Sequence, residues 1–282
     1  MGLDQSAPTP SRAGRNLPAA IAVGVLLGAA IIASLFWHKW LFVVVVLAAT
    51  LVAVDEVAKA LRVGGATVAH VPVLAGSFAM LVAAYLGGPM ALLVALALTV
   101  VATIFWRMPR GSVNFVRDTS ASVFLIAYVP MLAGFAVLLL RPEDGPERVV
   151  TYFLVTIASD VGGYAVGVLF GKHPMAPTIS PKKSWEGFAG SVLGCVGAAT
   201  ASVVLLLDGR WWVGVLLGLV AVLTATLGDL GESMIKRDLG IKDMSNLLPG
   251  HGGIMDRLDS LLIAAPIAWL LLTAMVDPGS IS

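Results

Sequence analysis

The chain has 282 residues, of which 58% are hydrophobic and only 12% are charged, and its mean hydropathy is +0.93. Soluble domains are about half apolar and about a quarter charged, so this composition indicates a membrane protein. The net charge of +1 gives no electrostatic footprint for nucleic acid. The single cysteine, Cys195, excludes an internal disulfide and a multi-cysteine metal site.

The hydrophobic runs predict about nine membrane-spanning helices, because each span needs about 20 mostly apolar residues. The run at 63–105 is too long for one span, and Gly87-Gly88-Pro89 should divide it, since glycine and proline interrupt helices. The run at 40–54 is short and reaches full length if the helix continues towards Lys59. The other runs are 17–37, 119–140, 149–170, 187–207, one starting at Trp211, and 260–276.

We therefore expect an all-α, polytopic integral membrane protein. Residues 1–16 are polar and contain proline and serine, which is typical of a disordered tail. Residues 17–282 should form one helical membrane domain, with N-terminal spans at 17–140 and a C-terminal half at 149–276 that carries the polar motifs and any catalytic site.

The distribution of basic residues predicts the orientation in the membrane. With nine spans, fourteen of the 18 Lys and Arg residues lie on the side of the N-terminus, and this bias marks the cytoplasmic side. We expect a multi-pass protein of the plasma (inner) membrane with a cytoplasmic N-terminus and the C-terminus on the opposite side. The four basic residues predicted for that opposite side are Lys39, Arg141, Arg148 and Arg210.

The densest group of charges lies at 227–260, where two hydrophobic runs end. Asp229 is so near the hydrocarbon that an unpaired carboxylate would be costly, and a bound cation would stabilise it. Glu232 and Lys236 are spaced i,i+4, which can be no more than local helix support. The alternative interpretation is an interfacial helix end whose charges face water.

The sequence PGHGG at 249–253 predicts a flexible loop before the last run. Glycine permits close approach of the backbone to a ligand, and the helix start that follows offers N–H groups for phosphate. Asp256 in the first turn would also be ordinary capping. Together, Asp229 and Asp256 suit Mg²⁺, which shares its coordination shell with substrate phosphates, while Lys and Arg side chains hold anionic oxygens.

A second polar segment contains ISPKKSWEG at 179–187. Lys182 and Lys183 fit either anion ligands or ordinary basic residues of a cytoplasmic loop. Trp185, taken alone, is more often an interface anchor than a stacking platform for a base.

Asp160 lies within a predicted span, where an ionisable group is a functional hypothesis by default. The alternative is a buried hydrogen bond to a Ser, Thr or Tyr neighbour. Gly162, Gly163 and Gly167 nearby permit either close helix packing or a polar cleft.

A long, charge-rich motif in the C-terminal half resembles the signature of phosphatidate cytidylyltransferases (CDP-diacylglycerol synthases). It reads SMIKR from Ser233, KD at Lys242 and PGHGGIMDRLD from 249 to 259, and the resemblance extends through LGDLGES and residues 179–187. The resemblance implies transfer of CMP from CTP to phosphatidate, giving CDP-diacylglycerol and pyrophosphate. It also implies Mg²⁺, with a second metal or a monovalent cation left open, and a homodimer.

The resemblance also assigns residues by position. The metal would be bound by Asp229 and Asp256, and the expected catalytic residues are Asp229, Asp256, Lys236 and Asp243. The expected substrate-binding residues are Asp160, Ser180, Lys182, Lys183, Trp185, Arg237, Lys242, His251 and Arg257. The family usually has Gly-Arg where this chain has Gly167-Val168, so any anion contact of that arginine must come from elsewhere, with Lys172 as a candidate.

Two other functions stay open at this level. An ion-coupled transporter would explain Asp160 and Asp229 as cation sites in broken helices, but it would not explain the basic, Gly-rich loop. A CDP-alcohol phosphatidyltransferase would show several Asp residues with a Gly-Ala-Arg element, which this sequence lacks.

Overall fold

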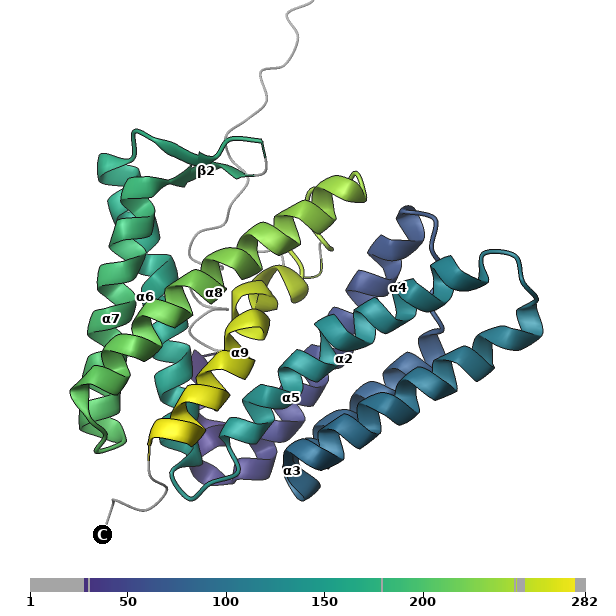
Figure 1. Ribbon diagram of the computed structural model, residues 1–282, viewed down its shortest axis with the longest axis horizontal. Helices are drawn as coiled ribbons and strands as arrows, with labels where there is room; N and C mark the ends of the chain where they lie inside the picture. The colour runs from purple at the N-terminus through teal and green to yellow at the C-terminus, as the bar shows by residue number, and fades with distance from the viewer. Residues whose placement is uncertain (1–27, 30, 179, 246, 248–251, 277–282) are drawn as a thin grey trace, which may run out of the picture.

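The computed structural model describes residues 28–29, 31–178, 180–245, 247 and 252–276, without the side chains of Pro181 and Lys182. This part of the chain is a bundle of helices with one short β-hairpin (Figure 1). The elements in order are α2 (Lys39–Val63), α3 (His70–Arg107), η1 (Met108–Arg110), α4 (Phe115–Tyr128), α5 (Pro130–Leu139), α6 (Gly145–Phe170), β1 (Pro174–Ala176), β2 (Ser180–Ser184), α7 (Trp185–Leu206), α8 (Trp211–Asp238) and α9 (Met255–Met275).

Seven segments of the described chain are long and apolar enough to cross a membrane, which confirms an all-α membrane fold. The expected number of nine is not confirmed. The first expected span, 17–37, lies mostly outside the described residues, although 31–37 is helical. The short run at 40–54 does continue as expected, because α2 runs on through Glu56 and Lys59 to Val63.

The long apolar run is broken at the glycine that the sequence indicates. Gly88 has φ 76° and ψ −161°, a conformation that favours glycine, and Pro89 follows it. The two arms of α3 then lie side by side, since a Cβ on Gly76 would stand 2.0 Å from the Thr99 side chain. In one straight helix these residues would lie about 34 Å apart at a rise of 1.5 Å per residue.

The polar segment after α6 forms a β-hairpin, which the sequence did not predict. Strands β1 and β2 pair antiparallel, with Pro174 opposite Ser184 and Ala176 opposite Ser180. Glu186 at the start of α7 fixes the base of the hairpin, because it accepts hydrogen bonds from the backbone N–H groups of Lys172 and His173. The hairpin therefore lies over the end of the α6–α7 pair (Figure 1).

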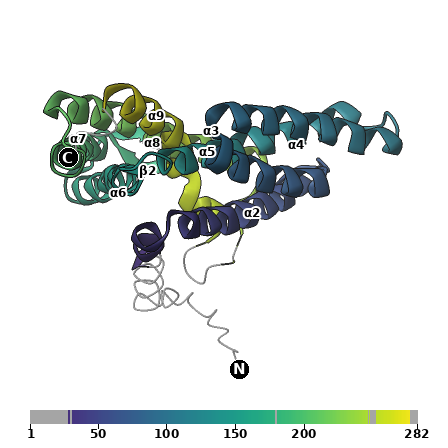
Figure 2. The same ribbon diagram turned by 90° about the horizontal axis from the view of Figure 1, so that it is seen from below.

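Glycines let α6 and α7 pack backbone to backbone. A Cβ on Gly162 would lie 2.6 Å from the Gly190 carbonyl oxygen, and one on Gly194 would lie 2.6 Å from the Ala158 carbonyl oxygen. The predicted close packing at Gly162 is thus present. Helices α6 to α9 form one group, and α3 and α4 extend away from it (Figure 2).

The loops gather at two opposite ends of the bundle. At one end lie the hairpin and the last turns of α2 and α8, where Gly64 contacts Leu239. At the other end the Lys39 ammonium donates to the Pro142 carbonyl, and Arg148 donates to the Val276 carbonyl. Lys39 and Arg148, two of the four basic residues predicted for the same side, therefore lie at the end opposite the hairpin.

Candidate active site

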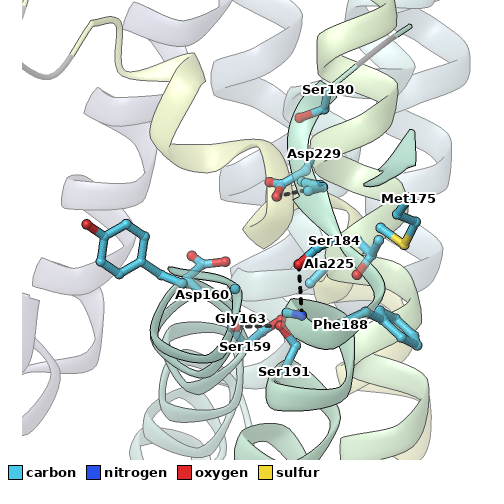
Figure 3. A pocket seen from close by; sticks show the side chains of 15 residues that line it. Ser159, Asp160, Gly163, Met175, Ser180, Ser184, Phe188, Ser191, Ala225 and Asp229 are labelled. Atoms are coloured by element: carbon cyan, nitrogen blue, oxygen red, sulfur yellow. Dashed lines mark hydrogen bonds and ion pairs between the residues drawn. The ribbon is translucent and has the colours of Figure 1, made fainter. Parts of the chain in front are cut away.

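A cavity of about 350 Å³ opens between α6, α7, α8 and the hairpin. Small and polar side chains line it together with larger apolar ones such as Met175 and Phe188 (Figure 3). Four of the predicted site residues line this cavity: Asp160, Ser180, Lys183 and Asp229. Gly163 and Gly167 also line it, so the glycines of α6 provide close helix packing and also form part of a cleft.

Lys183 and Asp229 meet at this cavity. The Lys183 Nζ lies 2.5 Å from the Asp229 Oδ2, and their side chains keep 26% and 30% of their accessible surface. Strand β2 carries the lysine and α8 carries the aspartate, 46 residues later. A lysine held this way can exchange its carboxylate partner for an anionic substrate oxygen, because both groups still face open space.

Asp160 projects from α6 into the same cavity (Figure 3). The positive charges of Lys183 and Arg257 and the negative charge of Asp229 all act on it. Asp160 thus lies among charged groups in the cavity, and its functional role stays a prediction. The nearby Ser159 uses its backbone carbonyl instead, which accepts a hydrogen bond from the Ser191 hydroxyl at 2.7 Å.

Behind Asp229, further carboxylates crowd together. The Ser260 hydroxyl lies 2.8 Å from the Asp229 Oδ1 and 3.1 Å from the Asp259 Oδ1, so one hydroxyl hydrogen serves two carboxylates. Asp259 also lies beside Glu232, whose Oε1 is buried without a hydrogen-bond partner among the described residues. The Tyr128 hydroxyl, near the same three carboxylates, is likewise buried and unpartnered in that part of the chain.

This surplus of oxygen atoms fits a hard cation. Within the described ranges, no three His, Cys, Asp or Glu side chains are arranged to hold a metal ion by themselves. Mg²⁺ does not require such a set, since it takes one or two carboxylates and completes its shell with water and substrate phosphates. Asp229 and Asp259 are the adjacent carboxylates that suit this role.

Asp256, the second predicted metal ligand, holds the loop before α9. Its carboxylate accepts from the backbone N–H groups of Gly253 at 2.8 Å and Met244 at 3.1 Å, and it pairs with Lys236 at 2.9 Å. Lys236 also pairs with Glu232 at 2.8 Å, so the predicted i,i+4 pair is present. Neither Asp256 nor Lys236 lines the cavity.

The other predicted residues lie farther from the cavity or outside the described residues. Trp185 is 57% exposed and packs edge-on against Phe188. Arg237, Lys242 and Asp243 are exposed near the end of α8 and in the loop after it. Lys172, the candidate substitute for the missing arginine, is also exposed, and Val168 does not line the cavity. His251 and the side chain of Lys182 lie outside the described residues.

Sequence reasoning missed two contributors. Ser260 looked like an ordinary start of the last span, and nothing in its spacing indicated contact with Asp229. Glu56 is a buried carboxylate on α2 that contacts the loop before α9. The sequence does contain a signal for Glu56, because an ionisable residue within a membrane-spanning helix indicates a functional role.

Comparison with known proteins decides the family. Residues 18–275 match the cytidylyltransferase family. This chain belongs to the cytidylyltransferase family. It is 47% identical to a phosphatidate cytidylyltransferase of Mycobacterium leprae, covering 96% of this chain and 92% of that protein. It is also 47% identical to one of Mycobacterium tuberculosis, with 96% and 87% covered.

A more distant relative matches little more than half of the chain. A phosphatidate cytidylyltransferase of Staphylococcus haemolyticus is 36% identical over 160 residues, which is 56% of this chain and 60% of that protein. The resemblance read from 233–259 is thus confirmed at the level of the family. The family match also covers the N-terminal spans, which the sequence motif did not reach.

Proposed function

We propose that this chain is a phosphatidate cytidylyltransferase, which transfers CMP from CTP to phosphatidate and releases pyrophosphate. The observation that carries the proposal is the pairing of Lys183 with Asp229 in a cavity that lies between apolar helices. One substrate is a soluble polyanion and the other is a lipid. Their reaction requires charged groups at the boundary between membrane and water, and the proposal assigns Lys183 and Asp229 to that boundary.

The reaction needs positioning more than acid–base chemistry. An oxygen of the phosphatidate phosphate bonds to the α-phosphorus of CTP, and the bond from that phosphorus to the pyrophosphate oxygen breaks. The attacking phosphate is already an oxyanion, so no residue has to remove a proton. Lys183 would orient phosphate oxygens, and Arg257 would add positive charge beside Asp160.

Magnesium belongs to this proposal as the cofactor. When bound, Mg²⁺ would neutralise charge on the phosphate oxygens, held by Asp229 with Asp259 or with Asp256. Asp259 is favoured by its position beside Asp229, whereas Asp256 would first have to give up Lys236. Lys183 would leave Asp229 for a substrate oxygen, and the carboxylate would then be free for the cation.

The arrangement in the membrane completes the proposal. We infer nine spans, with the N-terminus and the cavity on the cytoplasmic side of the plasma membrane. Support comes from the two arms of α3 and from Lys39 and Arg148 at the other end of the bundle. An impermeant maleimide should label the variant Arg110→Cys in inside-out vesicles and not in right-side-out vesicles.

The homodimer rests on the sequence resemblance, and the mass of the purified particle in detergent tests it.

The activity is tested with purified protein in detergent, CTP labelled in its α-phosphate, phosphatidate and Mg²⁺. We expect label in the lipid product only when phosphatidate and Mg²⁺ are both present. Well-folded protein that transfers no label would overturn the proposed function. Cation flux in liposomes would then test the transporter alternative.

A further inference from the structure

Glu56 on α2 is a buried carboxylate far from the motif in sequence. It is 3% exposed, and both of its oxygens accept hydrogen bonds. Oε1 accepts from the Ser245 hydroxyl at 2.5 Å and from the Ile254 N–H at 3.1 Å, and Oε2 accepts from the Met255 N–H at 2.8 Å. All three donors belong to the loop between α8 and α9 or to the first residue of α9.

These contacts cap α9 from another helix. The first N–H groups of a helix have no partner within the helix, and a side chain at the N-cap position normally supplies one. The N-cap of α9 is Ile254, which has no side-chain acceptor, and Glu56 takes its place. The fit is close, because a Cβ on Gly253 would lie 2.7 Å from the Glu56 Oε2.

The charge of Glu56 is matched by the same helix start. The partial positive charge at the N-terminus of α9 stabilises the carboxylate, because the Ile254 and Met255 N–H groups both donate to it. A glutamine would present an amide group to one of the N–H donors. It would therefore lose both the charge and one acceptor while keeping the volume.

The capped turn leads directly to the carboxylates of the site. Asp256 is in the first turn of α9, and Asp259 and Ser260 follow one turn later, where Ser260 bonds to Asp229. A shift of the start of α9 would move these groups relative to the cavity. The neighbouring Asp55 offers a contrast, because it pairs with Lys59 and His70 and is partly exposed.

We propose that Glu56 is a positioning residue for CMP transfer: it fixes the start of α9, and with it Asp259 and Ser260, against Asp229. This inference rests on the proposed function. It assigns a role in the reaction to the N-terminal half of the chain, which lies outside the motif.

The test compares Glu56→Gln with Asp55→Asn, a matched loss of one carboxylate on the next residue. We expect Glu56→Gln to lower kcat by about 10- to 100-fold, the range of a small misplacement of reacting groups, with KM for CTP unchanged. Asp55→Asn should keep the wild-type kcat. Equal kcat in the two variants, or a loss confined to KM, would overturn the proposal.

Two further measurements separate positioning from general instability. Ser245→Ala removes one donor to Glu56, so its effect on kcat should largely disappear in the Glu56→Gln background; additive effects would contradict a shared contact. Amide hydrogen exchange should be faster at Ile254 and Met255 in Glu56→Gln than in wild type, and unchanged protection there would also contradict the proposal. Because exchange needs no turnover, it tests Glu56 even if wild-type protein transfers no label and the proposed function fails.

Discussion

Two charged pairs, one at each end of the bundle, lie in different surroundings. At the end away from the cavity, Arg148 is 1% exposed and binds Asp144 at 2.8 Å and the carbonyls of Leu272 and Val276, which end α9. Its hydrogen bonds are all internal. At the cavity end, Lys183 and Asp229 keep about a quarter or more of their surface open. A buried, fully paired charge holds helices together, whereas a paired charge facing a cavity is available to a ligand.

The largest effect should come from the cavity pair. Lys183→Ala and Asp229→Asn should each lower turnover by at least ~10²–10³-fold, the scale for a group that stabilises transition-state charge, without lowering the unfolding temperature. Lys59→Gln, which removes an exposed lysine at the same end, should retain turnover. Wild-type rates in either cavity variant would remove the pair from the reaction.

The opposite outcome is expected for Arg148. Arg148→Met should destabilise the fold by about 3–5 kcal/mol, because it leaves Asp144 and two carbonyls unpaired in a buried place. Turnover per folded molecule should be close to wild type. Denaturant titration and activity on the same sample separate the two effects. A loss of turnover at full stability would contradict the purely structural role of Arg148.

The packing between α6 and α7 should affect both the stability of the fold and the turnover. Gly162→Ala places a Cβ 2.6 Å from the Gly190 carbonyl oxygen, so it should cost about 1–3 kcal/mol of stability and reduce turnover by moving the cavity wall. Gly197→Ala on α7 is the control, since a Cβ there meets nothing within 4 Å. If both variants behave alike, the close approach of the helices is not important.

The smallest effect should come from Thr151, in the second turn of α6. Its hydroxyl is fully buried and has no hydrogen-bond partner in the part of the chain described here. Thr151→Val should therefore raise stability by up to about 1 kcal/mol, by removing an unsatisfied polar group, and should leave turnover unchanged. A drop in the unfolding temperature would reveal a partner for the hydroxyl.

Local patterns were enough to predict the seven apolar segments of the described chain and the break at Gly88. The lengths of apolar runs determine the spans, and a glycine followed by proline marks a turn whatever the fold. The hairpin at 174–184 was missed, because its strands are short, contain proline and show no alternating apolar pattern.

The sequence indicated which residues belong to the candidate site but not which of them contact each other. The sequence indicated that Asp229 and Asp256 belong to one charged region, yet spacing could not tell that Asp259 would be the carboxylate beside Asp229. The contact of Glu56 with Met255 spans 199 residues, so no local pattern could predict it.

The most direct test of CMP transfer in this cavity is whether CTP protects a cysteine in its lining from a maleimide. The variant Ser180→Cys places a thiol in the cavity lining, and the natural Cys195 is fully buried, so a maleimide should label the new thiol alone. Saturating CTP with Mg²⁺ should slow labelling of Ser180→Cys and should leave labelling of Arg110→Cys unchanged. Equal labelling rates with and without CTP, in protein that transfers CMP, would place the reaction outside this cavity.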